Sequence, residues 1–176
     1  MRIITGEYRG RHFDVPRSFK ARPTTDFAKE NIFNVLNGCL DFEGATALDL
    51  FSGTGSIALE LASRGCRHVV SVELDRDHHR FIQSCIVKLQ TDRCIAVRGD
   101  AFRFVKSCRE QFDLIFADPP YALPTLATLP DVIMGSTLLR PEGIFVLEHG
   151  KDHDFTAHPR FFNHRQYGSV NFTLFR

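Results

Sequence analysis

From residue 45 onward, short apolar runs alternate with longer stretches in which apolar and polar residues mix. The runs are rich in Val, Ile, Leu and Phe, as strands buried on both faces are. The predicted strands are residues 45–51, 68–74, 94–100, 112–118 and 143–149, and the predicted helices between them are 54–65, 75–90, 101–109 and 125–139. This alternation predicts an α/β fold with a doubly wound, Rossmann-like and mostly parallel sheet that has helices on both faces.

The two ends of the chain follow other patterns. Residues 2–5 and 11–15 predict two short strands of a β-hairpin, and a helix near 25–39 follows. The alternating tail, residues 164–176, predicts one or two final strands. Because 176 residues fit one ordinary domain, we expect a single domain over 1–176, with 1–22 as an N-terminal extension and 23–176 as the core.

Composition narrows the class of protein. The chain is 43% apolar, which suffices for a buried core, and the longest apolar stretch is well short of the ~20 residues that cross a bilayer. Its five cysteines are scattered and include no C-x-x-C pair, which argues against disulfides and zinc and for a reducing compartment. We therefore expect a cytoplasmic protein that has no metal and no membrane partner.

Charge is unevenly placed along the chain. The net charge is only +1, but residues 1–22 carry six basic and two acidic side chains, so this extension is +4 and the rest is −3. Such a segment is either a solvated surface hairpin or an arm that attracts phosphates.

The first chemical motif is DLFSGTGS, residues 49–56, between a predicted strand and a predicted helix. Gly53 and Gly55 permit a tight turn and a close approach of ligand to backbone, and the helix start presents free N–H groups. The motif indicates a nucleotide-type site. It also fits a dinucleotide fingerprint or a purely structural turn.

Three carboxylates at strand ends refine this interpretation. Glu73 is placed to accept hydrogen bonds from ribose hydroxyls, and Asp100 from an adenine amino group, although Glu73 also fits a surface acid at a helix start. Asp49 would repel a pyrophosphate and attract an ammonium or sulfonium. The alternative is that Asp49 caps the amides of its own loop.

The second chemical motif is FADPPY, residues 116–121, which ends the fourth predicted strand across the switch point of the sheet. Asp118 and the rigidly held carbonyl of Pro119 form two acceptors for one exocyclic amino group of a nucleobase. They would leave the nitrogen lone pair free to attack a sulfonium methyl group. Tyr121 offers a face on which a flipped-out base can stack. In isolation, the motif would fit a strand-ending turn.

These motifs resemble a known family. In this order, DLFSGTG, VELD, GDA and DPPY look like a class I S-adenosylmethionine-dependent methyltransferase that acts on an amino nitrogen. The segments RIITGEYRGRHF, RPTTDFAKENIFN and LLRPEGIFVLEH are similar to the bacterial ribosomal RNA small-subunit (16S rRNA) guanine-N2 methyltransferase family. The resemblance implies a seven-stranded sheet with an added hairpin and S-adenosylmethionine as methyl donor, which becomes S-adenosylhomocysteine. It also implies a guanine of ribosomal RNA, naked or in a small-subunit particle, as acceptor, and we expect a monomer.

The resemblance assigns roles to individual residues. Its cofactor-binding positions fall on Asp49, Phe51, Ser52, Gly53, Gly55, Glu73, Leu74, Asp100 and Ala101. Its amino-group clamp falls on Asp118, Pro119, Pro120 and Tyr121. The residues expected to contact RNA are Arg2, Arg9, Arg11, Arg22 and Thr24. Glu7 departs from the family, which often has a basic residue at this turn.

Other functions stay open at this point. Enzymes that methylate adenine or a protein glutamine usually have Asn where Asp118 stands. A nicotinamide-dependent oxidoreductase would not need D-P-P-Y, and a non-catalytic RNA-binding domain would not need the clamp. None of the cysteines follows a proline in a strand-end loop, which favours a nitrogen target over a ring carbon. His149 is placed to touch substrate, but a structural histidine fits as well.

Overall fold

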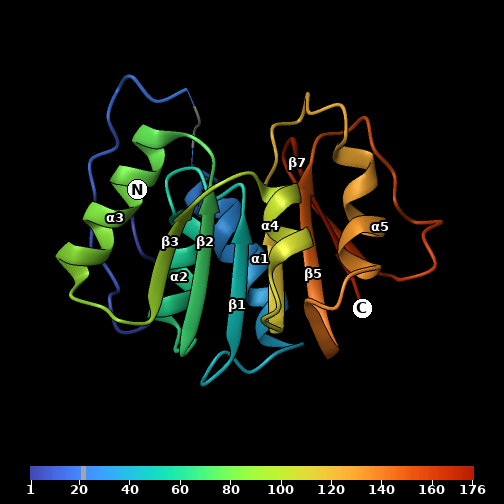
Figure 1. Ribbon diagram of the computed structural model, residues 1–176, viewed down its shortest axis with the longest axis horizontal. Helices are drawn as coiled ribbons and strands as arrows, with labels where there is room; N and C mark the ends of the chain where they lie inside the picture. Colours follow the sequence, from blue (N-terminus) through green and yellow to red (C-terminus); the bar gives the residue numbers. More distant parts are fainter. Residues whose placement is uncertain (21–22) are drawn as a thin grey trace.

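The computed structural model describes residues 1–20 and 23–176. Its centre is a seven-stranded sheet in the order β3-β2-β1-β4-β5-β7-β6 (Figure 1). The strands are β1 (Thr46–Leu50), β2 (His68–Glu73), β3 (Cys94–Arg98), β4 (Phe112–Ala117), β5 (Leu139–His149), β6 (Phe161–Tyr167) and β7 (Val170–Phe175). β1 to β5 run parallel, whereas β7 is antiparallel to both β5 and β6. The predicted α/β fold with a mostly parallel sheet is confirmed.

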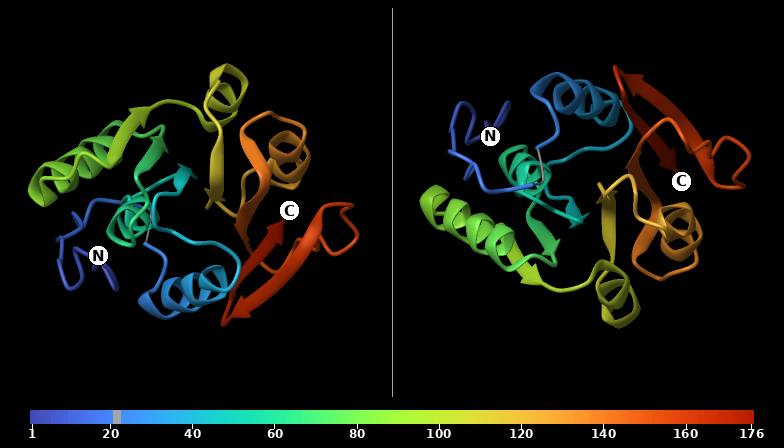
Figure 2. Two further views of the ribbon diagram at one scale, coloured as in Figure 1. Left: turned by 90° about the horizontal axis from the view of Figure 1, so that it is seen from below. Right: turned by 90° about the horizontal axis from the view of Figure 1, so that it is seen from above.

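Helices cover both faces of the sheet (Figure 2). They are α1 (Asp26–Asn37), α2 (Ser56–Ser63), α3 (Arg76–Leu89), α4 (Ala101–Ser107), the 3-10 helix η1 (Leu126–Thr128) and α5 (Leu129–Met134). Successive strand residues point to opposite faces, so Ala47 packs with α1, α2 and α3, while Leu48 packs with α4 and α5. Two apolar cores therefore enclose the sheet, as the doubly wound pattern predicts.

The segment after β4 corrects one predicted boundary. The helix predicted over 125–139 is only η1 followed by the short α5, and β5 begins at Leu139. Pro130 fits the first turn of α5, and Gly135 caps its end, so the helical stretch is short. Leu139 then pairs with Phe112 across a register shift, which extends β5 beyond the predicted 143–149. The other predicted bounds are within a few residues of the observed ones.

The N-terminal arm, residues 1–14, is not the regular hairpin that was predicted. Its predicted strands reduce to a single antiparallel bridge between Arg2 and His12. The Ile3 amide donates to the Arg11 carbonyl at 3.0 Å, and the Gly10 amide donates to the Ile3 carbonyl at 2.9 Å, so the arm is an irregular hairpin. The physical reason is that the amides of Ile4, Thr5, Glu7 and Tyr8 bind to α2 instead of to a partner strand.

Glu60 of α2 is the anchor of the arm. Its side chain is fully buried and accepts hydrogen bonds from the amides of Ile4 (2.9 Å) and Thr5 (3.0 Å). It also pairs with Lys29 of α1 at 3.4 Å and Arg64 at 3.0 Å. Burial lowers the pKa of Lys29, while the charge of Glu60 opposes this shift. Glu60 thus joins the arm to two helices through a buried ion pair.

Gly6 brings the arm against the end of α2. Its φ of +94° is in the left-handed region, and a Cβ atom there would lie 1.9 Å from the Ser63 carbonyl oxygen. The Glu7 amide donates to that same oxygen at 2.8 Å, and the Tyr8 amide donates to Ser63 Oγ at 2.9 Å. The turn therefore docks by backbone contact that a larger residue at position 6 would block.

The buried ion pair between Glu60 and Lys29 predicts a large effect on stability. Glu60→Gln keeps the size of the side chain but leaves the Lys29 ammonium without its anionic partner. We expect the free energy of unfolding in urea to fall by about 3–5 kcal/mol, the usual cost of breaking a buried pair. Glu7→Gln, which removes an exposed pair with Arg93, is the control and should cost less than about 1 kcal/mol. Equal losses in both variants would contradict the anchoring role.

Candidate active site

The carboxyl ends of β1, β4 and β5 meet at the upper edge of the sheet in Figure 1. Leu50 is in register with Ala117, and Ala117 with Leu147, so the residues that follow lie at one level. Because β1 pairs with both β2 and β4, this edge is the switch point of the sheet, where α/β folds bind ligands. The FADPPY motif therefore lies beside the glycine motif, as the sequence predicts.

Asp49 organises the glycine loop from beneath. Its Oδ2 atom accepts hydrogen bonds from Ser52 Oγ at 2.6 Å and from the Ala58 amide at 3.1 Å. The side chain is buried, and burial raises the pKa of Asp49 to about 7, although both hydrogen bonds oppose the shift. The alternative in which Asp49 caps its own loop therefore describes these contacts. The same carboxyl remains a source of negative charge under the loop.

Glu73 closes the glycine loop from β2. Its Oε2 atom accepts from the Gly53 amide at 2.7 Å, and its Oε1 atom accepts from the Asp75 amide at 2.8 Å. Gly53 and Gly55 have φ angles of +59° and +79°, so both use the left-handed conformation that glycine permits. Glu73 thus has a structural contact on each oxygen, and a ribose would have to use the remaining lone pairs.

The other predicted cofactor residues lie at the ends of the next strands. Leu74 follows β2 with 63% of its surface exposed. Asp100 precedes α4 and caps it by accepting from the Arg103 amide at 2.9 Å, and Ala101 is the first residue of that helix. Phe51 packs edge-to-face on Phe102, with ring centroids 6.2 Å apart. Since β1, β2 and β3 are neighbours in the sheet, these residues lie together at the carboxyl ends of the strands.

The amino-group clamp has a partner that the sequence analysis missed. Glu148, near the end of β5, is 5% exposed and accepts from Tyr121 Oη at 2.9 Å and from Thr24 Oγ1 at 3.2 Å. The register of β4 and β5, in which Ala117 pairs with Leu147, also places Glu148 beside Asp118. The available signal was a lone carboxylate near the end of the apolar run GIFVLEH, which follows the same strand-end rule as Asp118.

The clamp residues differ in exposure. Asp118 is half-buried and Pro119 is buried, whereas Pro120 is exposed and Tyr121 keeps 42% of its surface exposed. The Tyr121 hydroxyl is tied to Glu148, which sets the orientation of the ring. A flat aromatic face is therefore available beside the Asp118 carboxyl.

Acidic side chains concentrate negative charge at this edge of the sheet. Burial and the neighbouring Glu148 charge raise the pKa of Asp118 well above its ordinary range, and burial raises the pKa of Glu148 as well. Burial and the same glutamate raise the pKa of Tyr121. With Asp49, three crowded carboxyl groups come from β1, β4 and β5, and a cationic ligand would relieve their repulsion.

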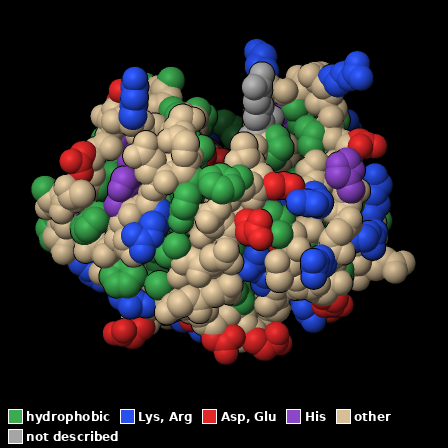
Figure 3. Space-filling view, turned by 180° about the vertical axis from the view of Figure 1, so that it is seen from behind, with side chains coloured by type: hydrophobic (Ala, Val, Ile, Leu, Met, Phe, Trp, Pro, Cys, Tyr) green, Lys and Arg blue, Asp and Glu red, His purple; other side chains and the backbone are tan. Residues whose placement is uncertain are grey.

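The predicted RNA-contacting residues are dispersed around the arm. Arg2 pairs with Asp26 at 3.0 Å, and Arg11 donates to the Lys88 carbonyl at 2.9 Å. Arg9 is exposed. Figure 3 shows Lys and Arg side chains gathered on the side of the molecule that carries the arm and α3. The remaining predicted contact, Arg22, lies outside the described residues.

A cavity of about 430 Å³ lies between the arm and the helix starts. It is lined by Met1, Arg2, His12, residues 23–26 and Ser56. Thr24 belongs both to this lining and to the Glu148 cluster, and Ser56 begins α2 directly after the glycine loop. The cavity therefore adjoins both predicted binding regions.

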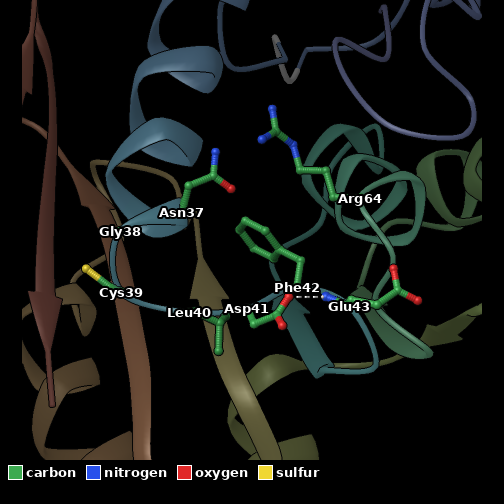
Figure 4. Close-up of a pocket in the computed structure, with 8 residues that line it drawn as sticks. All are labelled: Asn37, Gly38, Cys39, Leu40, Asp41, Phe42, Glu43 and Arg64. Carbon is green, nitrogen blue, oxygen red and sulfur yellow. Dashed lines mark hydrogen bonds between the residues drawn. The ribbon is translucent and has the colours of Figure 1, made fainter.

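A second cavity lies at the opposite end of the sheet (Figure 4). It measures about 530 Å³ and is lined by residues 37–43 and Arg64. Residues 38–43 precede β1, so this cavity is far from the strand ends that carry the motifs. The Arg64 guanidinium stacks 4.4 Å from the Phe33 ring centroid, which makes it part of the packing there.

His149 has a structural environment. It is 1% exposed, its Nδ1 is 2.8 Å from the Gly150 carbonyl, and its Nε2 is 2.8 Å from Thr173 Oγ1. In residues 1–20 and 23–176, no three His, Cys, Asp or Glu side chains gather as a metal site. No helix in that same part of the chain has the length and apolar character to span a membrane.

Comparisons with known proteins agree with this architecture. The family model described as "Conserved hypothetical protein 95" matches residues 1–176. "Putative rRNA methyltransferase YlbH" of Bacillus subtilis is 34% identical over 156 residues, which cover 86% of this chain and 84% of that protein. "Ribosomal RNA small subunit methyltransferase D" of Escherichia coli is 30% identical over 148 residues, covering 84% and 74%. A solved hypothetical protein of Thermus thermophilus has a TM-score of 0.87 at 30% identity, covering 100% of this chain and 99% of that one.

The fold and the strand-end motifs define a class I methyltransferase architecture. The chain belongs to the conserved hypothetical protein 95 family, and its resemblance to bacterial ribosomal RNA small-subunit methyltransferases is thereby confirmed. The names of these relatives do not specify a base, so the guanine N2 target stays a prediction.

Asp49 predicts a pH dependence of stability. Its pKa of about 7 in the folded protein exceeds the value of about 4 in an unfolded chain, so its contribution is full below pH ~4 and is lost as the pH rises through 7. We expect the free energy of unfolding of the ligand-free protein to fall over this range. Asp49→Asn should remove part of the fall, because its amide oxygen can still accept while no proton is lost.

Urea titrations at several pH values measure this slope. The pKa values of Asp118 and Glu148 are also raised, so loss of their protons also lowers the free energy of unfolding as the pH rises. Part of the pH dependence should therefore remain in Asp49→Asn. The exposed Asp41 supplies the control variant, Asp41→Asn, which should match the wild-type slope. If Asp49→Asn also has the wild-type slope, the buried proton is assigned to the wrong residue.

Proposed function

We propose that this protein is an S-adenosylmethionine-dependent methyltransferase that methylates the exocyclic N2 amino group of a guanine in small-subunit ribosomal RNA, in the cytoplasm. The observation that carries the proposal is the Asp118 carboxyl at the end of β4, beside a glycine loop with a buried carboxyl beneath it. The relatives named as ribosomal RNA methyltransferases support the RNA substrate. Naked RNA and an assembling particle both fit this chemistry.

The residues at the strand ends fit a cationic adenosine cofactor. The backbone of the glycine loop, with Phe51 and Ser52, would lie along it, while Glu73 accepts from the ribose hydroxyls and Asp100 from the adenine amino group. Leu74 and Ala101 would flank the adenine. S-adenosylmethionine supplies an activated methyl group on a positively charged sulfur, and the three crowded carboxyl groups favour that charge over a polyphosphate.

The clamp residues would prepare the acceptor nitrogen. An ionised Asp118 oxygen and the Pro119 carbonyl accept the two N–H groups of the exocyclic amine, which turns its lone pair out of conjugation with the ring. The fixed φ angles of Pro119 and Pro120 hold these acceptors in place. Tyr121 stacks against the base, and most of the rate gain comes from positioning.

Removal of the clamp carboxylate should abolish methyl transfer. We expect Asp118→Ala to lower kcat at least ~100-fold, the usual effect of losing one electrostatic contact to the transition state, while S-adenosylhomocysteine binding persists by calorimetry. Transfer is measured with radiolabelled methyl donor on small-subunit RNA, and nucleoside mass analysis distinguishes N2-methylguanosine from N6-methyladenosine. Asp131→Ala, an exposed change on α5, should act as wild type. Full turnover without the Asp118 carboxyl would rule out the clamp.

The arm should contribute electrostatic affinity for RNA. Replacing Arg9 and Arg11 with Ala removes two positive charges, so binding should weaken and the slope of log Kd against log salt should fall by about two. Filter binding across a salt series measures both. Arg109→Ala, an exposed arginine after α4 at the other end of the sheet, should leave the slope unchanged. Equal loss of cofactor affinity in the double variant would give the arm a different role.

A further inference from the structure

The end of β5 holds the Tyr121 ring at two points. The Tyr121 hydroxyl donates to Glu148 Oε1 at 2.9 Å, and the ring lies against the backbone of Gly150. A Cβ atom built on Gly150 would lie 3.1 Å from Tyr121 Cδ2 and 3.6 Å from its Cγ and Cε2 atoms. One side of the ring is therefore covered by a residue that has no side chain, while 42% of the Tyr121 surface stays exposed.

The two contacts restrain different rotations of the Tyr121 side chain. The hydroxyl lies on the axis of the Cβ–Cγ bond, so its hydrogen bond to Glu148 fixes the χ1 rotamer but permits the ring to turn about that axis. Contact between the Cδ2–Cε2 side of the ring and Gly150 opposes this turn. Together they hold the plane of the ring in one direction, and a nucleobase stacked on the ring takes its orientation from that plane.

The residues that hold the ring are themselves fixed by the sheet. Glu148 and His149 lie in the part of β5 that pairs with β7. The Gly150 carbonyl oxygen is 2.8 Å from His149 Nδ1, and the second oxygen of Glu148 accepts from Thr24 Oγ1 at 3.2 Å. A strand positions a side chain more precisely than a loop does, and Tyr121 lies in the loop after β4. The sheet therefore supplies a rigid support for a ring that comes from a loop.

We propose that Glu148 and Gly150 are positioning residues that fix the plane of the Tyr121 ring, and with it the orientation of the base that stacks there. The inference rests on the proposed function for the identity of that base, whereas the fixed ring is a property of the free protein. The φ angle of Gly150 is outside the left-handed region. The space that the ring occupies, and not the backbone conformation, is therefore what requires a glycine at this position.

Three-bond couplings between the backbone and Cγ measure the χ1 rotamer of Tyr121 in the ligand-free protein. We expect one rotamer in the wild type and averaging between rotamers in Glu148→Ala, which has no acceptor for the hydroxyl. Glu148→Gln should keep the single rotamer, because its amide oxygen accepts from Tyr121 and its amide nitrogen can donate to Thr24. Glu110→Ala, an exposed change, is the control. Equal rotamer populations in the wild type and in Glu148→Ala would overturn the proposal.

Gly150→Ala tests the second contact. The added methyl group must displace the ring by a few tenths of an ångström, so the ring carbon shifts of Tyr121 should change while those of the other two tyrosines stay in place. Gly38→Ala is the control, because a Cβ atom there would make an ordinary contact of 3.4 Å with the Val35 carbonyl oxygen. If the Tyr121 shifts are the same in Gly150→Ala and the wild type, Gly150 has no positioning role.

Kinetics connect the fixed ring to methyl transfer. Tyr121→Phe keeps the stacking face but loses the bond to Glu148, so kcat should fall about tenfold while the Kd for RNA changes less than about twofold. Glu148→Ala should lower kcat to a similar extent, and Glu148→Gln should restore most of it. Tyr167→Phe, which removes a hydroxyl on β6, is the control. A merely structural role would lower stability without separating kcat from RNA affinity in this way.

The two kinds of measurement separate the proposed function from the positioning role. If the wild type transfers no methyl group to RNA while the couplings show a single Tyr121 rotamer that depends on Glu148, the proposed function fails and the fixed ring stands. An active wild type whose kcat is unchanged in Tyr121→Phe would overturn the positioning role alone.

Discussion

The candidate site depends on the crowding of three carboxyl groups at the switch point of the sheet. Asp49 belongs to β1, Asp118 follows β4 and Glu148 lies near the end of β5, and these three strands are consecutive in the sheet. The parallel register brings their ends to one level, so repulsion between the carboxyls is built into the fold. Hydroxyl and amide donors, shared protons or a bound cation must offset that repulsion.

A second buried charge cluster lies on the face that carries α1 and α2, and it links the arm to the site. Lys29 donates to the Arg2 carbonyl at 2.7 Å and to Ser56 Oγ at 3.0 Å, and it pairs with Glu60. Because Ser56 is the first residue after Gly55, the same ammonium group contacts the arm and the end of the glycine loop. The arm is therefore attached to the rest of the fold by a specific internal contact.

The arm also shows how a departure from the family pattern is accommodated. Glu7, where the resemblance led us to expect a basic residue, pairs with Arg93 at 2.9 Å at the surface. Arg11 caps the C-terminal end of α3 through the Lys88 carbonyl. A positive charge near a helix C-terminus is favourable in its own right, so Arg11 combines a structural contact with the expected attraction for phosphates. Arg9 is exposed at the turn and is the simpler electrostatic contact.

The sequence alone determined the order of strands and helices, the two-faced sheet and the motifs at the ends of β1 to β4, because these follow from local periodicity and from residues adjacent in the chain. Only the tertiary structure decided three features. Glu148 lies beside Asp118 because of the register between β4 and β5, which no local pattern encodes. The arm stays irregular because its amides bind the Glu60 side chain, more than 50 residues away. The pKa values of Asp49 and Asp118 are raised because burial and neighbouring charge arise only when distant segments pack together.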